Sequence, residues 1–352
     1  DDADGAAIDG VVAAVAAVDP SLGVRTATGA HDNDIDKPFY VPALYLMAQI
    51  GPQWSWGINI SSPFGLESNW PDETFPAFGT GPIPDAIEPA RSKLVMVNVN
   101  PNIAYKLSSA TSLAFGVDYY YVKQARLDSQ DIKIAGSGDG TGWNAALLHR
   151  QGAWSFGLSY RSDVDTAISG TVTAGANSSS GKIEVGFPAM WQAGVRYQAS
   201  NSLALELDIE LTRWSSFNAL TITHATPGVP NPIVNVNAWR DTMAYRLGGS
   251  YRLTSDRQLR FGYSYDETAQ GDDHFNARIP DADRHLFGIG LAQRFGDWTL
   301  EAGYMYILFK DRNYGSPVPF GAYGADANGT NAYNGQYRGT VHILGLGVSA
   351  EF

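Results

Sequence analysis

The stretch "SLALELDIEL", Ser202 to Leu211, alternates strictly between apolar and polar or small side chains. Leucine or isoleucine occupies every odd position from 203 to 211, whereas the even positions from 204 to 210 hold one alanine and three carboxylates. Side chains of a β-strand point alternately to opposite faces, so the pattern predicts a strand with one apolar and one charged face. It recurs in "QWSWGINIS" (53–61), "AWSFGLSYR" (153–161) and "QLRFGYSYD" (258–266).

Segments of this kind predict about fourteen strands, and tight turns alternate strictly with long polar connections between them. The predicted strands lie near 11–27, 39–50, 53–63, 92–107, 111–126, 142–151, 153–163, 184–198, 202–216, 238–253, 257–267, 284–295, 297–309 and 339–352. The long connections lie at about 64–91, 127–141, 164–183, 217–237, 268–283 and 310–338. This arrangement is typical of an all-β transmembrane antiparallel β-barrel with short periplasmic turns and long extracellular loops.

The two faces of these strands differ in a way that decides which one meets lipid. One face mixes glycine and small residues with charges of both signs, such as Arg196, Glu206 and Arg260, whereas the other is rich in leucine and aromatic rings. A Lys or Arg at the midplane of a lipid-facing surface costs roughly 2–4 kcal/mol, so reversing four strands would cost on the order of 10 kcal/mol. A soluble β-sandwich is the competing interpretation, but rings gathered toward strand ends are typical of aromatic girdles at two membrane interfaces. The apolar face is therefore predicted to point outward.

The composition argues against several classes of function. The chain has no cysteine, which rules out disulfide and thiolate chemistry, and its formal net charge of −12 argues against nucleic acid as a partner. The six histidines are scattered and form no Ser-His-Asp grouping, so no enzyme is expected. "GSGDGTG" (136–142) lacks the lysine of a phosphate loop, and "DDHFNARIPDADRH" (272–285) lacks EF-hand spacing. No cofactor or metal is expected, and the acidic stretch 272–285 is predicted to organise its own loop.

Longer segments resemble a known family in their order and spacing. They include "WSWGINISSPFGLESNW" (54–70), "NPNIAYKLSSATSLAFGVDYYYVKQARLD" (100–128), "FPAMWQAGVRYQ" (187–198) and "RIPDADRHLFGIG" (278–290). The chain from about residue 39 to its end resembles the FadL-type family of outer-membrane transporters for long-chain fatty acids and hydrocarbons, which includes toluene-uptake members. The resemblance implies a fourteen-stranded barrel in the outer membrane of a Gram-negative bacterium.

Members of the resembled family have an N-terminal hatch that plugs the lumen and contains an Asn-Pro-Ala motif. That motif does not occur in this sequence, which begins with "DDADGAAIDG". Residues 1–10 are therefore expected to be a remnant of the hatch, and residues 11–352 are expected to form the barrel.

In the resembled family, substrate leaves the lumen sideways through an inward kink of the third strand. The matching positions here are Ser62, Pro63, Phe64 and Gly65. Pro63 cannot donate a ladder hydrogen bond and Gly65 tolerates unusual dihedral angles, so strand pairing should break at this point. The alternative is that Pro63 and Gly65 end a strand where a loop begins.

Fatty-acid-binding members hold the ligand carboxylate with basic residues near the external ends of the fifth and tenth strands. The matching positions are Asp128 and Asn235, and neither is basic. Arg126 continues the inward parity of Asp118 and is predicted to bind ligand in their place, although it would suit a lumenal charge network equally well. The departure favours an uncharged hydrocarbon or aromatic over a free fatty acid, because such a ligand needs mainly an apolar pocket.

These expectations combine into one function, the passive uptake of a hydrophobic small molecule with lateral release near Ser62 to Gly65. The expected partners are that molecule, the lipid bilayer and lipopolysaccharide, and the protein is expected to be monomeric. Two alternatives stay open. One is an open porin for polar solutes, which a charged lumen would also suit, and the other is a structural or adhesive barrel whose loops carry the function.

Overall fold

The computed structural model describes residues 40–72, 74–75 and 88–350. The predicted first strand, 11–27, and the expected hatch remnant, 1–10, lie outside the described residues, so both stay predictions. No α-helix in the described part of the chain is long and apolar enough to cross a membrane.

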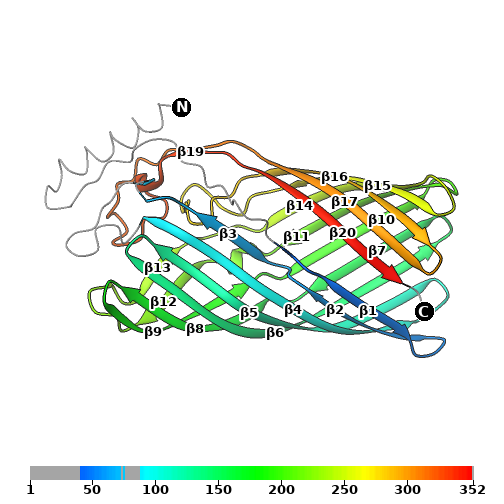
Figure 1. Ribbon diagram of the computed structural model, residues 1–352, viewed down its shortest axis with the longest axis horizontal. Coiled ribbons are helices and arrows are strands. Elements are labelled where there is room, and N and C mark those ends of the chain that lie inside the picture. Colours follow the sequence, from blue (N-terminus) through cyan, green and yellow to red (C-terminus); the bar gives the residue numbers. More distant parts are fainter. Residues whose placement is uncertain (1–39, 73, 76–87, 351–352) are drawn as a thin grey trace.

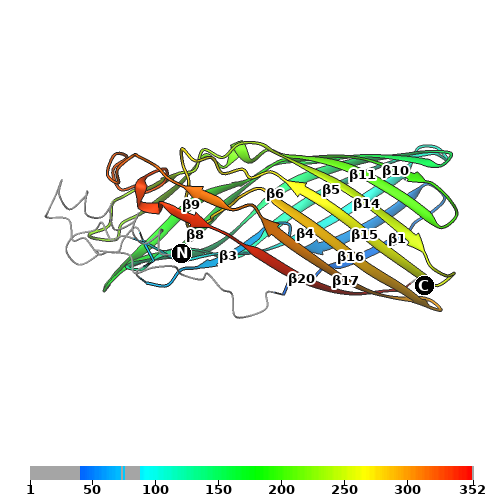
Figure 2. The ribbon, with the colours of Figure 1, turned by 90° about the horizontal axis from the view of Figure 1, so that it is seen from above.

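The described residues form one large antiparallel sheet whose strands are inclined to the long axis of the molecule (Figures 1 and 2). Successive strands in the following list are hydrogen-bonded to each other: β1 (Leu44–Gln49), β2 (Trp54–Ser61), β4 (Pro89–Lys106), β5 (Thr111–Ser129), β6 (Ile132–Gln151), β7 (Trp154–Arg161), β10 (Met190–Gln198), β11 (Leu203–Thr212), β14 (Thr242–Arg252), β15 (Arg257–Asp266), β16 (Arg284–Phe295), β17 (Trp298–Phe309) and β20 (Thr340–Ala350). Each predicted strand other than 11–27 overlaps one of these strands, and β4, β5 and β6 extend beyond their predicted bounds.

The total of about fourteen strands is not confirmed. Within the described residues β1 pairs only with β2 and β20 only with β17, so the sheet does not close there. At such an edge the outward side chains are more exposed than those of a strand with a neighbour on each side. Leu344 and Leu346 on β20 are 82% and 91% exposed, whereas Leu207 on β11, which has a strand on each side, is 46% exposed.

The assignment of the two faces is confirmed by burial and by ion pairs. On β11 the side chains of Leu205, Leu207 and Ile209 are exposed on one face. On the opposite face Arg196 Nη1 lies 3.0 Å from Glu206 Oε2 and Arg246 Nη2 lies 3.1 Å from Glu210 Oε1. These ion pairs connect β11 to its neighbours β10 and β14 on the charged face of the sheet.

Several connections predicted to be loops are strands instead. The segment 127–141 continues β5 and begins β6, and 164–183 forms a hairpin of β8 (Val164–Ala174) and β9 (Asn177–Phe187). A second hairpin, β12 (Ala219–His224) and β13 (Ile233–Val236), extends this layer. The prediction was wrong because glycine, serine and threonine give these strands no apolar outer face. Such a face is needed only where lipid covers the wall.

The connections 268–283 and 310–338 pack together into a small structure that we call the cap. It includes β18 (Arg312–Tyr314), β19 (Gly335–Tyr337) and the short 3-10 helix η2 (Asn331–Tyr333). Its buried core consists of Phe75, Phe275, Ala277, Tyr314, Ala327, Ala332 and Tyr333. The Arg312 guanidinium lies 4.5 Å from the centre of the Phe275 ring and donates to the carbonyl oxygen of Asp281 at 2.6 Å. Figure 1 shows β19 toward the end of the wall far from the C-terminus.

The acidic stretch 272–285 organises its loop through hydrogen bonds. The Asp283 carboxylate accepts from the amide of Thr268 at 2.9 Å and from the hydroxyl of Tyr265 at 2.7 Å. The Asp281 carboxylate accepts from the hydroxyl of Thr268 at 2.7 Å. Residues 40–72, 74–75 and 88–350 contain no group of three or more His, Cys, Asp or Glu side chains that could hold a metal ion.

Candidate functional site

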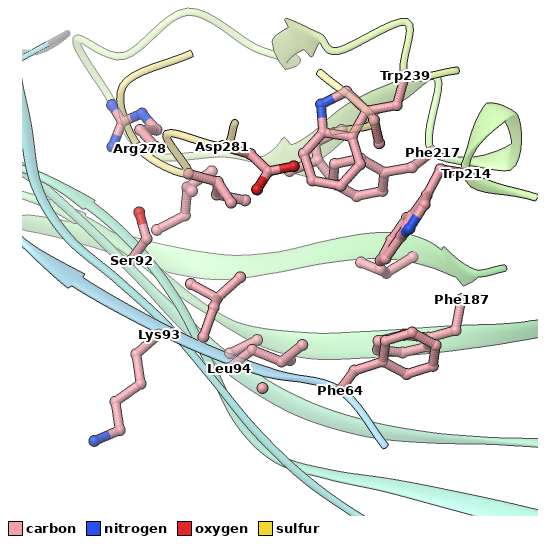
Figure 3. A pocket seen from close by; sticks show the side chains of 18 of the residues that line it. Phe64, Ser92, Lys93, Leu94, Phe187, Trp214, Phe217, Trp239, Arg278 and Asp281 are labelled. Atoms are coloured by element: carbon pink, nitrogen blue, oxygen red, sulfur yellow. The ribbon is translucent and has the colours of Figure 1, made fainter. Parts of the chain in front are cut away.

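A cavity of about 780 Å³ lies inside the wall beneath the cap (Figure 3). Its sides come from β3 (Gly65–Asn69), β4, β5, β6, β8, β9 and the neighbouring strands, and the cap segment Arg278 to Asp281 lines it from above. Six aromatic residues line it, namely Phe64, Phe187, Trp214, Phe217, Trp239 and Phe309. Trp214 lies in the short 3-10 helix η1 (Trp214–Ser216), and its ring centre is 5.1 Å from that of Trp239. The lining is mainly apolar, with charged side chains among it, and a mainly apolar lining favours an apolar ligand.

The third strand of the prediction is interrupted where it passes this cavity. β2 ends at Ser61, which pairs with Asn98, and β3 begins at Gly65, which pairs with Val95. Three residues, 62–64, therefore stand opposite two residues, 96 and 97, of β4. The one extra residue is a β-bulge, and it reverses the alternation of side chains. Strict alternation from Trp54 would place Phe64 on the outer face, but its ring points into the cavity (Figure 3).

We call residues Ser62 to Gly65 the kink. The Ser62 hydroxyl donates to the carbonyl oxygen of Met96 at 2.7 Å, which fixes the start of the bulge to β4. The Phe64 ring centre lies 5.2 Å from that of Phe187 and 5.7 Å from that of Trp214. Pro63, Phe64 and Gly65 all line the cavity. Because β3 resumes pairing with the same strand, the kink is a break within the wall and not the end of a strand.

β3 connects the kink to the cap. Among the described residues it pairs only with β4. Its inward Ser68 hydroxyl donates to the carbonyl oxygen of Arg278 at 2.7 Å, and the indole nitrogen of Trp70 donates to the carbonyl oxygen of Ala277 at 2.8 Å. A movement of the cap segment 277–278 would therefore be transmitted to β3 and to the kink.

The four arginines that line the cavity already have partners. The Arg246 guanidinium pairs with Glu210 at 3.1 Å, and that of Arg284 lies 3.3 Å from Asp281. Arg126 pairs with Asp128, and Arg278 donates to the Asp128 carbonyl oxygen at 2.7 Å. An incoming carboxylate would have to compete with these partners.

The wall becomes polar on the side of the cavity that faces the tight turns. Asp118 on β5 is fully buried, and its carboxylate accepts from the amides of Asn98 at 2.6 Å and Asn144 at 2.7 Å. Arg161 Nε lies 3.5 Å from the same carboxylate. We call these four side chains the polar layer. A hydrophobic molecule moving along the lumen from the cavity would meet this layer.

The whole of residues 4–352 matches the family model described as outer membrane protein transport protein (OMPP1/FadL/TodX). The chain belongs to this family. It is 23% identical to the long-chain fatty acid transport protein of Escherichia coli O6:H1, in a match that covers 95% of this chain and 83% of that protein. The fold resembles a FadL homologue of Pseudomonas aeruginosa, with a TM-score of 0.68, 18% identity and coverage of 88% and 76% of the two chains. It also resembles the toluene transporter TodX of Pseudomonas putida, with a TM-score of 0.62, 14% identity and coverage of 90% and 83%.

Family membership confirms the outer-membrane location and the resemblance found in the sequence. It also makes this chain an outer-membrane transport protein.

The expected inward direction of Arg126 in this FadL/TodX family member is corrected by the register of β5. Met96 on β4 pairs with Val122, but Val95 pairs with Gln124, so β5 also contains one extra residue. Beyond that bulge Arg126 stands opposite Lys93. Figure 3 shows Lys93 pointing away from the cavity. Atoms of Arg126 still line the cavity, and its role in ligand binding stays a prediction.

The part that Phe187, Trp214, Phe217 and Trp239 play in the cavity was not predicted from the sequence. All four lie at or beyond the ends of alternating segments, in "FPAMW", "TRWSSF" and "AWRD". Alternation assigns side chains to a face only within a strand, so it says nothing about these positions. Rings just before or just after an alternating run were the available signal.

Proposed function

We propose that this protein carries a neutral hydrophobic molecule passively from the external side into the cavity and releases it sideways at the kink. The observation that supports this proposal most directly is that Pro63, Phe64 and Gly65 line the same apolar cavity that the cap covers. A ligand in the cavity would therefore touch the one interruption of β2 and β3. The proposal needs no cofactor, energy source or catalytic group.

The polar layer supports sideways release over passage along the lumen. A hydrocarbon that left the cavity toward the tight turns would have to pass Asp118, Asn98 and Asn144. It makes no hydrogen bonds, so it would gain nothing from these groups and would disturb their bonds to each other. Lipid on the outer side of the kink offers an apolar environment directly.

The cavity lining favours an uncharged ligand, and an aromatic one in particular. Rings contribute about 0.5–1.5 kcal/mol per aromatic contact beyond the area they bury, and Phe64, Phe187, Trp214, Phe217 and Trp239 are available. Similar proteins are named for fatty acids in Escherichia coli and for toluene in Pseudomonas putida. The paired arginines of this chain favour the second kind of substrate. We also propose that the protein is a monomer and that the bilayer around it contains lipopolysaccharide.

Equilibrium dialysis of labelled toluene against the purified full chain tests the cavity. Trp214→Ala or Trp239→Ala is expected to weaken binding about tenfold, because each removes a ring worth roughly 1–1.5 kcal/mol. Trp298→Ala is the matched control, because Trp298 is 52% exposed on the outer face. Equal losses in all three variants would contradict the proposed site. Palmitate is expected to displace toluene less well than decane does.

An open porin for polar solutes is the second candidate. The observation in its favour is the row of lumenal ion pairs, which includes Arg260 and Glu301 at 2.8 Å. Single-channel recording distinguishes the two. A steady, large ionic current through the full-length protein in a planar bilayer would favour the porin, whereas the hydrophobic route predicts toluene transport with little ionic conductance.

A further inference from the structure

The outer face of β3 to β6 carries a group of cations beyond the level of the tyrosines that face lipid. Tyr119 and Tyr121 on β5 are 41% and 45% exposed on that face. Lys123 follows two residues later and is exposed, and Arg126 lies opposite Lys93. At about 3.3 Å per residue, Lys123 and Arg126 lie roughly 7 and 16 Å along the strand from Tyr121.

The two bulges bring these cations to the same face. The bulge in β5 puts Arg126 and Asp128 opposite Lys93 and Arg91, and the bulge at the kink puts Glu67 opposite Lys93. Ala125 and Leu127 pack on the inner side against buried clusters. Lys133 on β6 is exposed and lies two residues from Ala135, which pairs with Arg126. We call Arg91, Lys93, Lys123, Arg126 and Lys133 the basic patch.

The charge of the basic patch is opposite to that of the chain. Its five cations lie on the same face as three carboxylates, Glu67, Asp128 and Asp139, which leaves a formal charge of +2 (five minus three) in a protein of net charge −12. Glu67 pairs with Arg91 and with Lys93 at 2.8 Å, and Asp128 pairs with Arg126. In the described part of the chain Lys123 and Lys133 make no ion pair. A cationic surface just outside an aromatic girdle faces the headgroups of the outer leaflet.

We infer that the basic patch binds the phosphate groups of a phosphorylated glycolipid of the outer leaflet. Arginine and lysine bind phosphate by charge-assisted hydrogen bonds, and bound lipid would lie beside β3, whose outer edge has no partner among the described strands. The inference rests on the outer-membrane location and not on the transport proposal, so either can fail without the other.

Native mass spectrometry of the full chain in detergent tests the site with lipid A as the probe. Lys123→Gln and Lys133→Gln are each expected to weaken binding about fivefold. Lys106→Gln is the matched control, because Lys106 is an exposed lysine at the opposite end of β4. It should leave binding unchanged. Retained resistance of the barrel to unfolding by dodecyl sulfate would show that each variant is folded.

Glu67→Gln gives the sharper result, because it is expected to change affinity in the other direction. Loss of this carboxylate removes the anion that pairs with Arg91, so lipid A should bind about fivefold more tightly, whereas a merely structural role would weaken binding. Equal affinity for lipid A with and without its phosphates would overturn the inference. So would an equal effect of Lys106→Gln, or displacement of lipid A by millimolar inorganic phosphate.

Discussion

The wall on the two sides of Tyr120 differs in regularity. Toward the tight turns, β2, β4 and β5 pair residue for residue and every second side chain faces lipid. Toward the cap, the strands on both sides of β4 each contain one extra residue, at the kink and between Val122 and Gln124. The regular part supplies a barrier to lipid and a buried polar layer. The bulged part supplies Phe64 to the cavity and Arg126 to the outer face, so the features that distinguish this member lie where the alternation fails.

The largest effect is expected in the regular part, from Asp118→Ala. This change removes the buried carboxylate that accepts from Asn98 and Asn144 and leaves the partly buried Arg161 guanidinium without its anion. Breaking a buried pair of this kind costs about 3–5 kcal/mol. Urea unfolding in lipid vesicles measures the loss. A change below about 1 kcal/mol would show that the polar layer contributes no more than surface groups do.

An arginine introduced on the outer face tests whether the two parts of the wall have different surroundings. Leu207→Arg places a cation on the lipid face of β11 and is expected to cost about 2–4 kcal/mol. Ser137→Arg places the same side chain on the exposed outer face of β6, beyond the aromatic girdle, and should cost less than about 1 kcal/mol. Similar costs at both sites would mean that the upper wall is also covered by lipid.

The link between β3 and the cap is expected to give a smaller effect. Ser68→Ala and Trp70→Phe each remove one hydrogen bond to the cap, worth about 1–1.5 kcal/mol. Hydrogen exchange at the amides of 65–69 should become about tenfold faster in each variant, while the amides of 54–61 stay unchanged. Equal acceleration in β2 and β3 would contradict the separate attachment of β3 to the cap.

The smallest effect concerns the pH dependence of the cap. Burial raises the pKa of Asp283, but the Thr268 amide, the Tyr265 hydroxyl and the Lys310 ammonium outweigh it and hold that pKa below its ordinary value. A carboxylate with a lowered folded pKa stabilises the fold above its unfolded pKa of about 4, and this contribution is lost as the pH falls through the folded pKa. The cap should therefore become less protected from protease below about pH 4.

Two variants give the controls for this pH dependence. Asp283→Asn should remove part of the dependence of protease protection on pH, because asparagine does not titrate. Asp326 is expected to act in the opposite sense, because burial raises the pKa of its carboxyl group and acidification then relieves the cost of a buried charge. Asp326→Asn should therefore make the cap more sensitive to acid, and a pH dependence unchanged in both variants would contradict the assignment.

The sequence predicted those strands whose two faces meet different surroundings, because their side chains then alternate with a period of two. Leu203 to Leu211 alternates because one side of β11 meets lipid and the other meets Arg196 and Arg246, so every predicted strand in the described part was found. It failed for 127–141 and 164–183, because strands with water on their outer side carry glycine and serine there. Pairing between backbones is independent of side chains, so such strands have no apolar pattern.

The candidate site was only partly predictable for a related reason. Pro63 and Gly65 indicated a break, because their chemistry opposes regular pairing. The bulge between Val122 and Gln124 has no such residue, so parity placed Arg126 on the wrong face. The contact of Phe64 with Phe187 and Trp214 joins segments more than a hundred residues apart, which local pattern cannot show.

The most direct test of lateral release restores regular pairing at the kink. Deleting Phe64 removes the extra residue, and Pro63→Val returns the missing amide, so β2 and β3 should form one continuous strand with β4. Phe64→Leu is the matched control, since it keeps the bulge and an apolar side chain. Uptake of labelled toluene by cells that produce the folded protein is expected to fall to background in the deletion variant and to persist in Phe64→Leu. Undiminished uptake by the straightened strand would contradict release through the kink.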